Sequence, residues 1–483
     1  MQPITKDIFL KTVFCKTLGW RLRNGVIRPE LTEAQKFRME QGKKVHRMAR
    51  GLYTGGIFVN ETNSGSAAVR TRDLLNNPDT DVIFEATFLA GNYITKADIL
   101  IRNRDGWELV EVKSNVNAKD ELIDDMAYTT MVAQSAGFSP SSVHLILIDK
   151  NYRLGMPDER LFVKTDMTEQ VLARVGEFST AADYIDSVSS TPEEPVPELI
   201  YNCKQCEYFG ECHGEDVESH IFTVPRLRQE TIEELIASGI TSIHDIPGSI
   251  SLSDNQRRVV ECVRTGTMRI DPALRQKLAA IRWPASYLDF ETMMTALPLW
   301  PGIAPYEQIP IQYSLHIRGS PALEISHKEY LAKPDRDCRR DLAERLIADL
   351  RGDGSIITYS SFEKTTITAL SRLFPDLSAD LQSLTRRIVD LEPCIKCVNH
   401  PEFCGRTSIK IVLPVLVPGL SYEGLEIANG DDALVTFAKM TQGMMAPDEM
   451  ERKRAAMLEY CKMDTLAMVK LHEVLEGMVS SVN

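Results

Sequence analysis

The sequence lacks the long apolar run that a membrane span requires. No stretch approaches the roughly 18 consecutive apolar residues of a transmembrane helix. The segment from Met1 to Trp20 carries charges throughout and has no apolar centre of the kind found in signal peptides. These absences predict a cytoplasmic protein with no membrane partner. Because disulfides are rare in that compartment, the ten cysteines point to metal binding before cross-links.

A surplus of positive charge is also missing. The chain has 55 lysines and arginines against 68 aspartates and glutamates, a net charge of −13. This balance argues against a protein that coats nucleic acid electrostatically. It leaves open an enzyme that holds nucleic acid in a local groove and uses carboxylates to bind metal ions.

The chain of 483 residues is too long for one hydrophobic core, and about three domains are expected. The patterns predict an α/β multidomain protein with no internal repeat. A first α/β domain spans 1–220, a mostly helical segment 221–284, and a second α/β domain 285–483. The Pro-, Ser- and Glu-rich stretch 187–197 is predicted to be a loop or linker.

Hydrophobic periodicity predicts the elements of both α/β domains. In the first domain they are a helix over 33–51, strands over 82–89, 93–102 and 107–113, a helix over 120–136 and a strand over 143–148. In the second they are strands over 287–291, 308–317, 324–331 and 355–359 and a long helix over 449–477.

The dipeptide Asp105-Gly106 predicts a two-residue hairpin turn in the first domain, which would pair Arg104 with Trp107. Because side chains alternate along a strand, one face of this hairpin would carry apolar core residues and the other three chemically active ones. These three are Asp98, Glu111 and Lys113.

Two carboxylates on one face can hold a hard cation such as Mg²⁺ or Mn²⁺, which activates water and neutralises phosphate charge. A lysine beside them can stabilise the charge that develops in a transition state. The alternative is a polar outer strand face with an incidental ion pair.

The order Asp98, then Glu111-x-Lys113 on a hairpin, then a helix and an apolar strand, resembles the PD-(D/E)xK nuclease core. The preceding helix, with Gly42-Lys-Lys-Val-His46, resembles the helix of RecB-like members that supplies a histidine ligand. The resemblance implies a restriction-endonuclease-like fold. It also implies metal binding by His46, Asp98 and Glu111, and a catalytic role for Lys113.

The helix that follows departs from that family. Relatives often carry Gln-x-x-x-Tyr there, and this sequence has Thr129 and Ala133 in the two positions. Since that motif positions substrate, the departure leaves open whether the first site cleaves or only binds.

Three cysteines cluster at Cys203, Cys206 and Cys212, with His213 and His220 close by. A tetrahedral site needs a fourth ligand, and one of these histidines would supply it in a zinc site. The spacing also resembles iron–sulfur RecB-like nucleases, including those of CRISPR adaptation, in which one cysteine precedes the nuclease core and three follow it. That resemblance implies a structural 4Fe–4S cluster held by four thiolates: Cys15, Cys203, Cys206 and Cys212.

A second group of acids lies in the second α/β domain. Asp289 and Glu291 share one face of an expected strand, and Glu363 stands where a later strand runs into a helix. Tyr460 and Asp464 are four residues apart on the long helix and share a face of it. Acids delivered by three separate elements suit a two-metal phosphoryl-transfer site, whose cations stand roughly 3.5–4 Å apart.

This set resembles the tyrosine-bearing DEDD exonucleases of the ribonuclease H-like fold. Asp289-x-Glu291 matches their first motif, and Glu363 the second, with Glu for the usual Asp. Tyr460-x3-Asp464 matches the third. The resemblance implies that the acids bind metal and that Tyr460 orients the attacking water.

The stretch from Asp289 to Leu471 also resembles an uncharacterised bacterial domain often found behind RecB-like nuclease domains, with Gln312 and Ser408-Ile409-Lys410 among the matching residues. Two further patterns stay open. The segment 235–247 resembles a helix-hairpin-like element that grips phosphates through backbone amides, or it is a helical spacer. A further zinc site is compatible with the spacing of Cys394, Cys397, His400 and Cys404.

Together these residues and resemblances predict a metal-dependent nuclease with two nuclease-type sites. It would hydrolyse DNA, at ends or single strands, in DNA repair or antiviral defence. The alternatives are an RNA-processing exonuclease and a nucleic-acid-binding scaffold with degenerate sites. The expected partner is nucleic acid, and the sequence leaves protein partners and cleavage polarity open.

Overall fold

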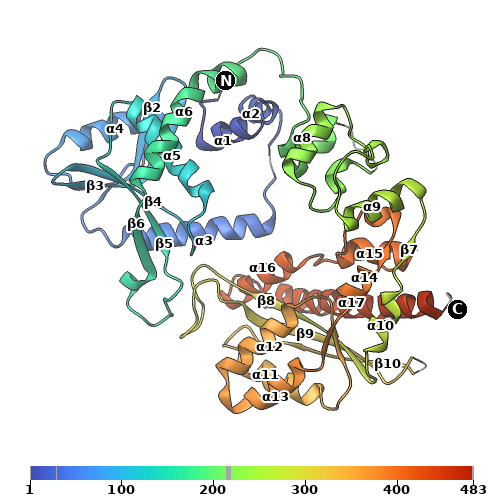
Figure 1. The fold of residues 1–483 in the computed structure, drawn as a ribbon. Helices are drawn as coiled ribbons and strands as arrows, with labels where there is room; N and C mark the ends of the chain where they lie inside the picture. The colour runs from blue at the N-terminus through green and yellow to red at the C-terminus, as the bar shows by residue number, and fades with distance from the viewer. Residues whose placement is uncertain (1, 29, 214–218, 322, 481–483) are drawn as a thin grey trace. The chain divides into compact units, whose positions relative to one another are not determined.

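The chain forms two compact units (Figure 1). The computed structural model describes residues 2–28, 30–213, 219–321 and 323–480. Unit 1 consists of Met1–Glu198 and Met294–Glu307, and unit 2 of Leu199–Met293 and Gln308–Asn483. A mixed sheet in each unit confirms the predicted α/β class. The finer three-part division of the chain stays a prediction.

Unit 1 is built on a six-stranded sheet whose spatial order follows the chain. Strands β2, β3 and β4 form an antiparallel meander, and β5 runs parallel to β4. At the edges, β1 is parallel to β2 and β6 is antiparallel to β5. The strands are β1 Ile57–Phe58, β2 Val82–Ala90, β3 Tyr93–Asn103, β4 Gly106–Val112, β5 Ser142–Ile148 and β6 Phe162–Asp166.

Helices cover both faces of this sheet (Figure 1). One face packs against α1, α4, α5 and α6 through a core that contains Phe9, Tyr128 and Phe178. The other face packs against α3 through Val45 and Ala49. The helices are α1 Lys6–Phe14, α2 Lys16–Arg23, α3 Glu33–Arg50, α4 Ser64–Asn76, α5 Asp120–Ser135 and α6 Thr168–Ser189.

The hairpin between β3 and β4 differs from the prediction. Asn103 pairs with Gly106, so the loop residues are Arg104 and Asp105, and the expected pairing of Arg104 with Trp107 is wrong. The Asn103 side chain accepts a hydrogen bond from the Asp105 N–H at 2.9 Å, and Gly106 takes a φ of 137°, which glycine adopts readily. Because the shift moves each partner by two residues, the side chains keep their predicted faces.

The end of α6 also differs from the prediction. The helix includes Ser187–Ser189, where the sequence predicted the start of a loop. The physical reason is packing, since Ser189 is buried and its hydroxyl accepts a hydrogen bond from Arg23 at 2.8 Å. None of the described helices is both long and apolar enough to cross a membrane.

Unit 2 is built on a five-stranded sheet of order β10-β9-β8-β11-β12. Strands β8, β9 and β10 are antiparallel neighbours, whereas β8, β11 and β12 are parallel. A separate two-stranded ladder joins β7 and β13. The strands are β7 Arg269–Ile270, β8 Ala285–Met293, β9 Ile309–Arg318, β10 Ile325–Leu331, β11 Ile356–Thr358, β12 Ile388–Asp390 and β13 Val398–Asn399.

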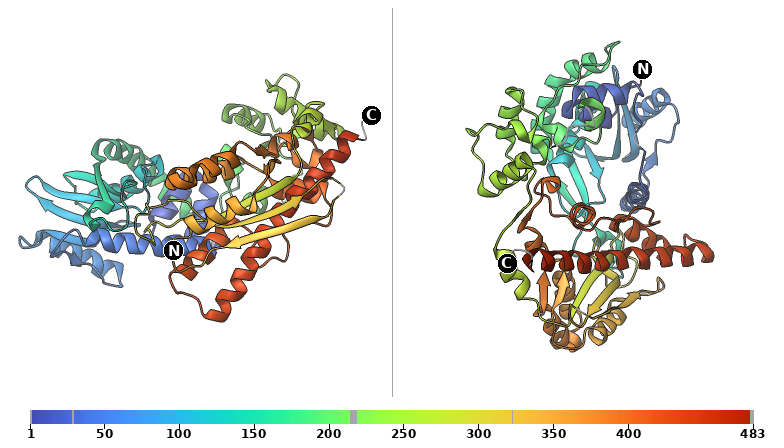
Figure 2. Two further views of the ribbon diagram at one scale, coloured as in Figure 1. Left: turned by 90° about the horizontal axis from the view of Figure 1, so that it is seen from below. Right: turned by 90° about the vertical axis from the view of Figure 1, so that its right-hand side faces the viewer.

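Side chains of β8 alternate between two layers of helices. Leu288 and Phe290 pack against α11, α12 and α13, whereas Tyr287 packs on the side of α10, α15 and α17. Both views of Figure 2 show the red α17 running along the sheet. Asp289 and Glu291 share the parity of Tyr287, so strand alternation turns both carboxylates toward the α17 side.

Helices make up most of the rest of unit 2. Three short ones form the helical segment predicted between the two α/β regions: α8 Gln229–Ala237, α9 Asp254–Thr265 and α10 Ala273–Ala279. The other helices are α7 Phe209–His213, α11 Arg339–Asp349, α12 Phe362–Leu373, α13 Ser378–Thr385, α14 Glu392–Ile395, α15 Ile409–Leu416, α16 Gly430–Thr441 and α17 Pro447–Ser480.

Candidate functional site

Three of the predicted acids of unit 2 meet in one place. Ligand oxygens of Asp289, Glu291 and Asp464 all lie within 4.8 Å of one another. The first two side chains come from β8 and the third from the middle of α17. Glu291 and Asp464 are only 8% and 9% exposed, so this is a dense group of carboxyls with little water around it.

Polar contacts hold α17 in place beside these acids. The Gln312 side chain donates to a backbone carbonyl of α17 at 2.9 Å. The Thr465 hydroxyl lies 2.7 Å from both the Ser314 hydroxyl and His316 Nδ1. All four side chains are buried, where an unmade hydrogen bond is costly. These contacts therefore fix the position of Asp464, the neighbour of Thr465.

Burial and mutual repulsion disfavour ionisation of these carboxyls. Burial raises the pKa of Asp289 well above its usual range, and the charges of Asp464, Glu291 and Glu363 raise it further. Burial also raises the pKa of Glu291 to about 8, of Glu363 to about 7 and of Asp464 to about 6. A divalent cation would reverse this effect, because a nearby positive charge favours the ionised forms.

Two tyrosines and a lysine border the acids. The Tyr422 hydroxyl donates to Asp464 Oδ1 at 2.6 Å, and a hydrogen bond from Tyr460 also favours the ionised form of Asp464. Lys410 Nζ lies 5.3 Å and 5.6 Å from the ring centres of Tyr422 and Tyr460. Sequence reasoning missed Tyr422, which lies in the loop between α15 and α16 and carries no pattern signal. The sequence analysis named Lys410 only as part of a resemblance and assigned it no role.

Glu363 stands beside this group rather than within it. It lies in the first turn of α12, and its Oε2 is buried without a hydrogen-bond partner among the residues that the structure describes. Burial, and then the charge of Asp390 at the end of β12, raise its pKa. An unsatisfied buried carboxylate oxygen is costly, so this atom fits a cation ligand better than it fits a purely structural role.

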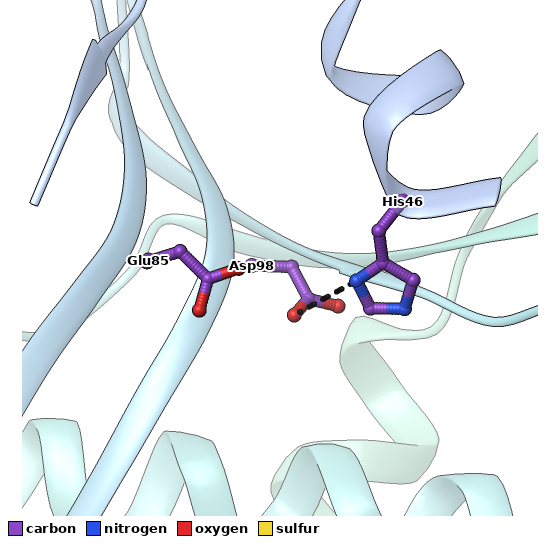
Figure 3. A group of neighbouring side chains, drawn as sticks. All are labelled: His46, Glu85 and Asp98. Carbon is purple, nitrogen blue, oxygen red and sulfur yellow. Dashed lines mark ion pairs between the residues drawn. The ribbon is translucent and has the colours of Figure 1, made fainter. Parts of the chain in front are cut away.

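In unit 1, three side chains point toward one another: His46, Glu85 and Asp98 (Figure 3). Their ligand atoms lie within 4.8 Å, and His46 Nδ1 is 3.6 Å from Asp98 Oδ1. Glu85 has a φ of 57° and faces Asp98 where the β2–β3 pairing skips both residues. Sequence reasoning missed Glu85, although its signal is present: it is the single charged residue in the apolar run Val82–Ala90.

Glu111 lies beside Asp98, but two lysines neutralise it. Its Oε1 is 2.8 Å from Lys6 Nζ and 3.0 Å from Lys113 Nζ. Burial opposes the ionisation of Glu111, and the two ammonium groups outweigh burial and hold its pKa at about 2. Lys113 also pairs with Asp125 on α5. Sequence reasoning missed Lys6, because nothing in a local pattern brings an N-terminal helix to this hairpin.

A cavity of about 540 Å³ lies beside the group that contains His46 and Glu85. His46 and Glu85 line this cavity together with three basic side chains, Lys43, Arg47 and Arg50. Arg50 also donates to Glu85 at 3.0 Å. Lysine and arginine beside a carboxylate group suit a phosphate that approaches bound metal.

The substrate-positioning residues of the resembled family have no counterpart on α5. Thr129 and Ala133 are both fully buried, so neither side chain reaches a surface where substrate could lie. The Thr129 hydroxyl instead accepts a hydrogen bond from Thr95 at 3.2 Å.

None of the four predicted cluster ligands forms a disulfide with another described residue, and Cys15 lies in unit 1 whereas the other three lie in unit 2. Within unit 1, Lys16 Nζ lies 2.5 Å from Glu198 Oε1, so the chain runs beside the start of α2 shortly before it reaches Cys203. Cys203 Sγ lies 3.8 Å from His213 Nε2, which keeps the zinc alternative open. The iron–sulfur assignment stays a prediction.

The second cysteine pattern is Cys394, Cys397, His400 and Cys404, and it is not among the groups of described residues whose ligand atoms lie close enough to hold a metal ion. Cys394 and Cys397 pack in one hydrophobic core, and Cys404 packs in another. The thiols of Cys397 and Cys404 each donate to a backbone carbonyl at 3.4 Å. Their spacing along the chain therefore reflects packing within the described residues.

A family model described as a domain of unknown function (DUF2779) matches residues 286–408. The match includes Asp289, Glu291 and Glu363 and ends before Tyr460 and Asp464. No curated protein and no solved structure matched the chain. The comparisons thus agree in part with the uncharacterised domain expected from the sequence, and they attach no activity to it.

Proposed function

We propose that the protein is a divalent-metal-dependent nuclease whose principal active site is the carboxylate group of unit 2. The observation that carries this proposal is that Asp289, Glu291 and Asp464 meet in a largely buried group and have raised pKa values. Such a group becomes stable in its ionised form when it binds a cation, and carboxylate oxygens favour Mg²⁺ or Mn²⁺. Phosphodiester hydrolysis makes direct use of that charge, because phosphate and attacking water both need it.

Each neighbouring side chain has a role in this proposal. Asp289, Glu291, Glu363 and Asp464 would hold the ions, which activate water and neutralise phosphate charge when bound. Tyr460 orients the attacking water through a hydroxyl whose position Asp464 sets. Tyr422 holds Asp464 itself. Lys410 adds positive charge where the phosphate would stand.

The two sheets support finer fold assignments. The order β10-β9-β8-β11-β12, with β9 antiparallel to both of its neighbours, supports a ribonuclease H-like fold of the DEDD type in unit 2. The β2–β4 meander followed by α5 and a parallel β5 supports a PD-(D/E)xK fold in unit 1.

Unit 1 would carry a second nuclease-type site, with His46, Glu85 and Asp98 as metal ligands. Glu111 and Lys113 would adjoin it, and a 4Fe–4S cluster on Cys15, Cys203, Cys206 and Cys212 would support the fold. A second candidate function for this unit is nucleic-acid binding without cleavage. The ion pairs of Glu111 with Lys6 and Lys113 favour that alternative, because both lysines contact Oε1 of an expected metal ligand and balance its charge.

Cleavage of end-labelled single- and double-stranded DNA and RNA, with Mg²⁺, Mn²⁺ or EDTA, tests the proposal. The matched variants are Asp289→Asn and Asp380→Asn, the latter at an exposed aspartate of α13. We expect metal-dependent cleavage of DNA at ends or single strands, lost in D289N and retained in D380N. Cleavage of RNA alone would favour the RNA-processing alternative. No cleavage of any substrate with either metal would overturn the nuclease proposal.

A further inference from the structure

Unit 2 contains a cavity of about 1020 Å³ apart from the carboxylate group. Its walls come from the segments that lead into α8 and α9 and from the chain between β12 and α15. The walls touch tightly at Gly405, which has a φ of 75°, and a Cβ there would come within 2.8 Å of Pro225 and Val259. Gln256 also donates to the Pro225 carbonyl at 2.9 Å. The cavity is therefore a defined part of the folded unit.

Positive charge dominates this cavity. The single acidic residue in the described lining, Glu392, is paired with Lys396 at 2.8 Å. Among the residues that the structure describes, no ion pair is formed by Arg226, Arg228 or Arg258. This cluster of basic residues contrasts with the net charge of −13 of the whole chain. The basic lining residues, all exposed, are Arg226, Arg228, Arg258, Lys396 and Arg406.

The remaining lining is polar and includes the beginnings of two helices. Thr231 lies in the first turn of α8, and Ser253 caps α9, so the dipoles of both helices add to the positive potential. Phe403 is the aromatic side chain in the described lining, and it is 1% exposed. A ligand here would therefore be held by its negative charges, with no ring available for stacking on bases.

A series of side-chain and backbone contacts connects this cavity with the carboxylate group. Thr407 in its wall donates to Glu392 at 2.7 Å, and the Glu392 N–H donates to Asp390 at 2.9 Å. Asp390 is the residue whose charge raises the pKa of Glu363 after burial has done so. From Thr407 the chain continues directly into α15, whose second residue is Lys410.

We propose that this cavity binds the phosphate backbone of a single-stranded nucleic acid and leads it to the carboxylate group. A concave site with basic groups on several walls fits a flexible strand, whose phosphates can turn toward each wall, better than a rigid duplex. Because basic side chains dominate the lining and its described part has no exposed ring for bases to stack on, the proposal assigns binding to the phosphates. The proposal rests on the proposed nuclease function for its link to cleavage, whereas backbone binding itself is measurable without catalysis.

The test is fluorescence anisotropy of the full chain with labelled single strands of about 20 nucleotides in EDTA, which prevents metal-dependent cleavage. The cavity variant is R226Q/R228Q/R258Q. The matched control, R351Q/R372Q/R386Q, removes the same charge from exposed arginines elsewhere on unit 2. We expect the cavity variant to bind at least about tenfold more weakly, with the slope of log K against log salt reduced by about two, since each phosphate contact contributes roughly 0.7. The control should bind as the wild type does.

If both variants weaken strand binding equally, or if neither weakens it, the cavity is not the binding site. A preference of more than about tenfold between oligo-dT and oligo-dA would overturn backbone recognition. DNA and RNA arms of the same assay show which backbone is bound. If D289N abolishes cleavage while the cavity variant binds normally, the cavity proposal fails and the nuclease proposal stands. If no strand is cleaved but binding depends on the cavity arginines, the reverse holds.

Discussion

The two candidate sites shift the pKa of their central glutamates, Glu111 and Glu291, in opposite directions. In unit 1, Lys6 and Lys113 lie within 3.0 Å of Glu111 and keep it ionised without any metal. In unit 2, Lys410 donates to a backbone carbonyl instead of a carboxylate, and the acids keep raised pKa values. Two sets of similar residues therefore differ in how much positive charge the protein itself supplies to their carboxylates. In the first, lysines balance Glu111, while burial and the charge of Glu111 still raise the pKa of Asp98. In the second, all the acids have raised pKa values and call for an added cation.

The largest expected effect comes from removing one acid of unit 2. Asp289→Ala should reduce exonucleolysis by about 10³-fold or more, because it deletes a ligand at the centre of the group, and metal stabilisation is worth several kcal/mol. Lys113→Ala should leave that activity unchanged and remove only an endonucleolytic or opposite-polarity activity of unit 1. The measurement is the product ladder from end-labelled single strands. Loss of the same products in both variants would show that the two sites form one machine.

The next effect concerns the cysteines. Protein purified without oxygen should be brown with about four irons per chain. Cys15→Ser should lose the iron and unfold the first domain, because cluster binding is coupled to folding. Cys397→Ser, from the pattern that packs as core, should keep the iron. Stoichiometric zinc without iron in the anaerobic wild type contradicts this assignment and favours the Cys/His alternative.

Two tyrosines of unit 2 offer a matched pair of smaller changes. Tyr460→Phe keeps the ring and deletes the hydroxyl that orients water, so folding should survive while cleavage slows by about 10²- to 10⁴-fold. Tyr422→Phe removes a hydrogen bond that only holds Asp464, and it should cost about tenfold. Single-turnover rates at saturating metal separate the two. Equal losses in both variants would remove the special role of Tyr460.

Metal-free stability should depend on pH through unit 2. The pKa values of Glu291, Glu363 and Asp464, about 8, 7 and 6, are raised by burial above their ordinary values near 4. Their native forms hold protons that the unfolded chain releases, so the free energy of unfolding should fall as pH rises from about 4 to 8.

Mg²⁺ at 100 times its dissociation constant should raise the free energy of unfolding by about 2.7 kcal/mol. The same Mg²⁺ concentration should stabilise the protein more at the higher pH, where the acids are ionised. Asp289→Asn should flatten both dependences because it removes repulsion among the acids. Thermal melts across this pH range with EDTA or Mg²⁺ provide the measurement. A melting temperature that changes with neither pH nor metal would contradict both the raised pKa values of these carboxyls and their binding of a cation.

The smallest expected effect tests the self-balance of unit 1. Lys6→Met should lower the free energy of unfolding by about 1 kcal/mol, since Lys113 still pairs with Glu111. Glu111 stabilises the fold above its unfolded pKa, and this contribution is lost as pH falls toward about 2. In K6M that acid loss should begin at higher pH, whereas K11M, at an exposed lysine of the same helix, should behave as the wild type. Urea melts at neutral and acidic pH compare the three proteins.

Most of the secondary structure was predictable because it depends on local pattern. The expected strands over 82–89 and 93–102 appear as β2 and β3, and the long helix expected over 449–477 appears within α17. The register of the β3–β4 hairpin was not predictable, because an Asn103 side chain competes with the Asp105-Gly106 turn signal. Parity along the strands survived the slip, so the faces were still assigned correctly.

The candidate sites were predictable where one element carries two partners. Asp289 and Glu291 alternate on one strand, and Tyr460 and Asp464 share one helix face, so spacing alone places each pair. Partners that arrive from elsewhere, such as Lys6 and Tyr422, depend on tertiary packing that no local pattern encodes. The basic cavity is of this second kind, since its arginines are spread along unrelated segments.

The assignment of Met294–Glu307 to unit 1 has a consequence for how the chain is made. Within that unit the Tyr306 hydroxyl donates to the Ser114 carbonyl at 2.5 Å, next to Lys113, and Ala296 is part of the core around Val45. A ribosome must therefore synthesise about a hundred residues beyond Glu198 before unit 1 has all its parts, at roughly 5–20 residues per second. A protein truncated after Glu198 would lack the last segment of unit 1. Fragments designed to isolate either unit must therefore keep Met294–Glu307 with unit 1.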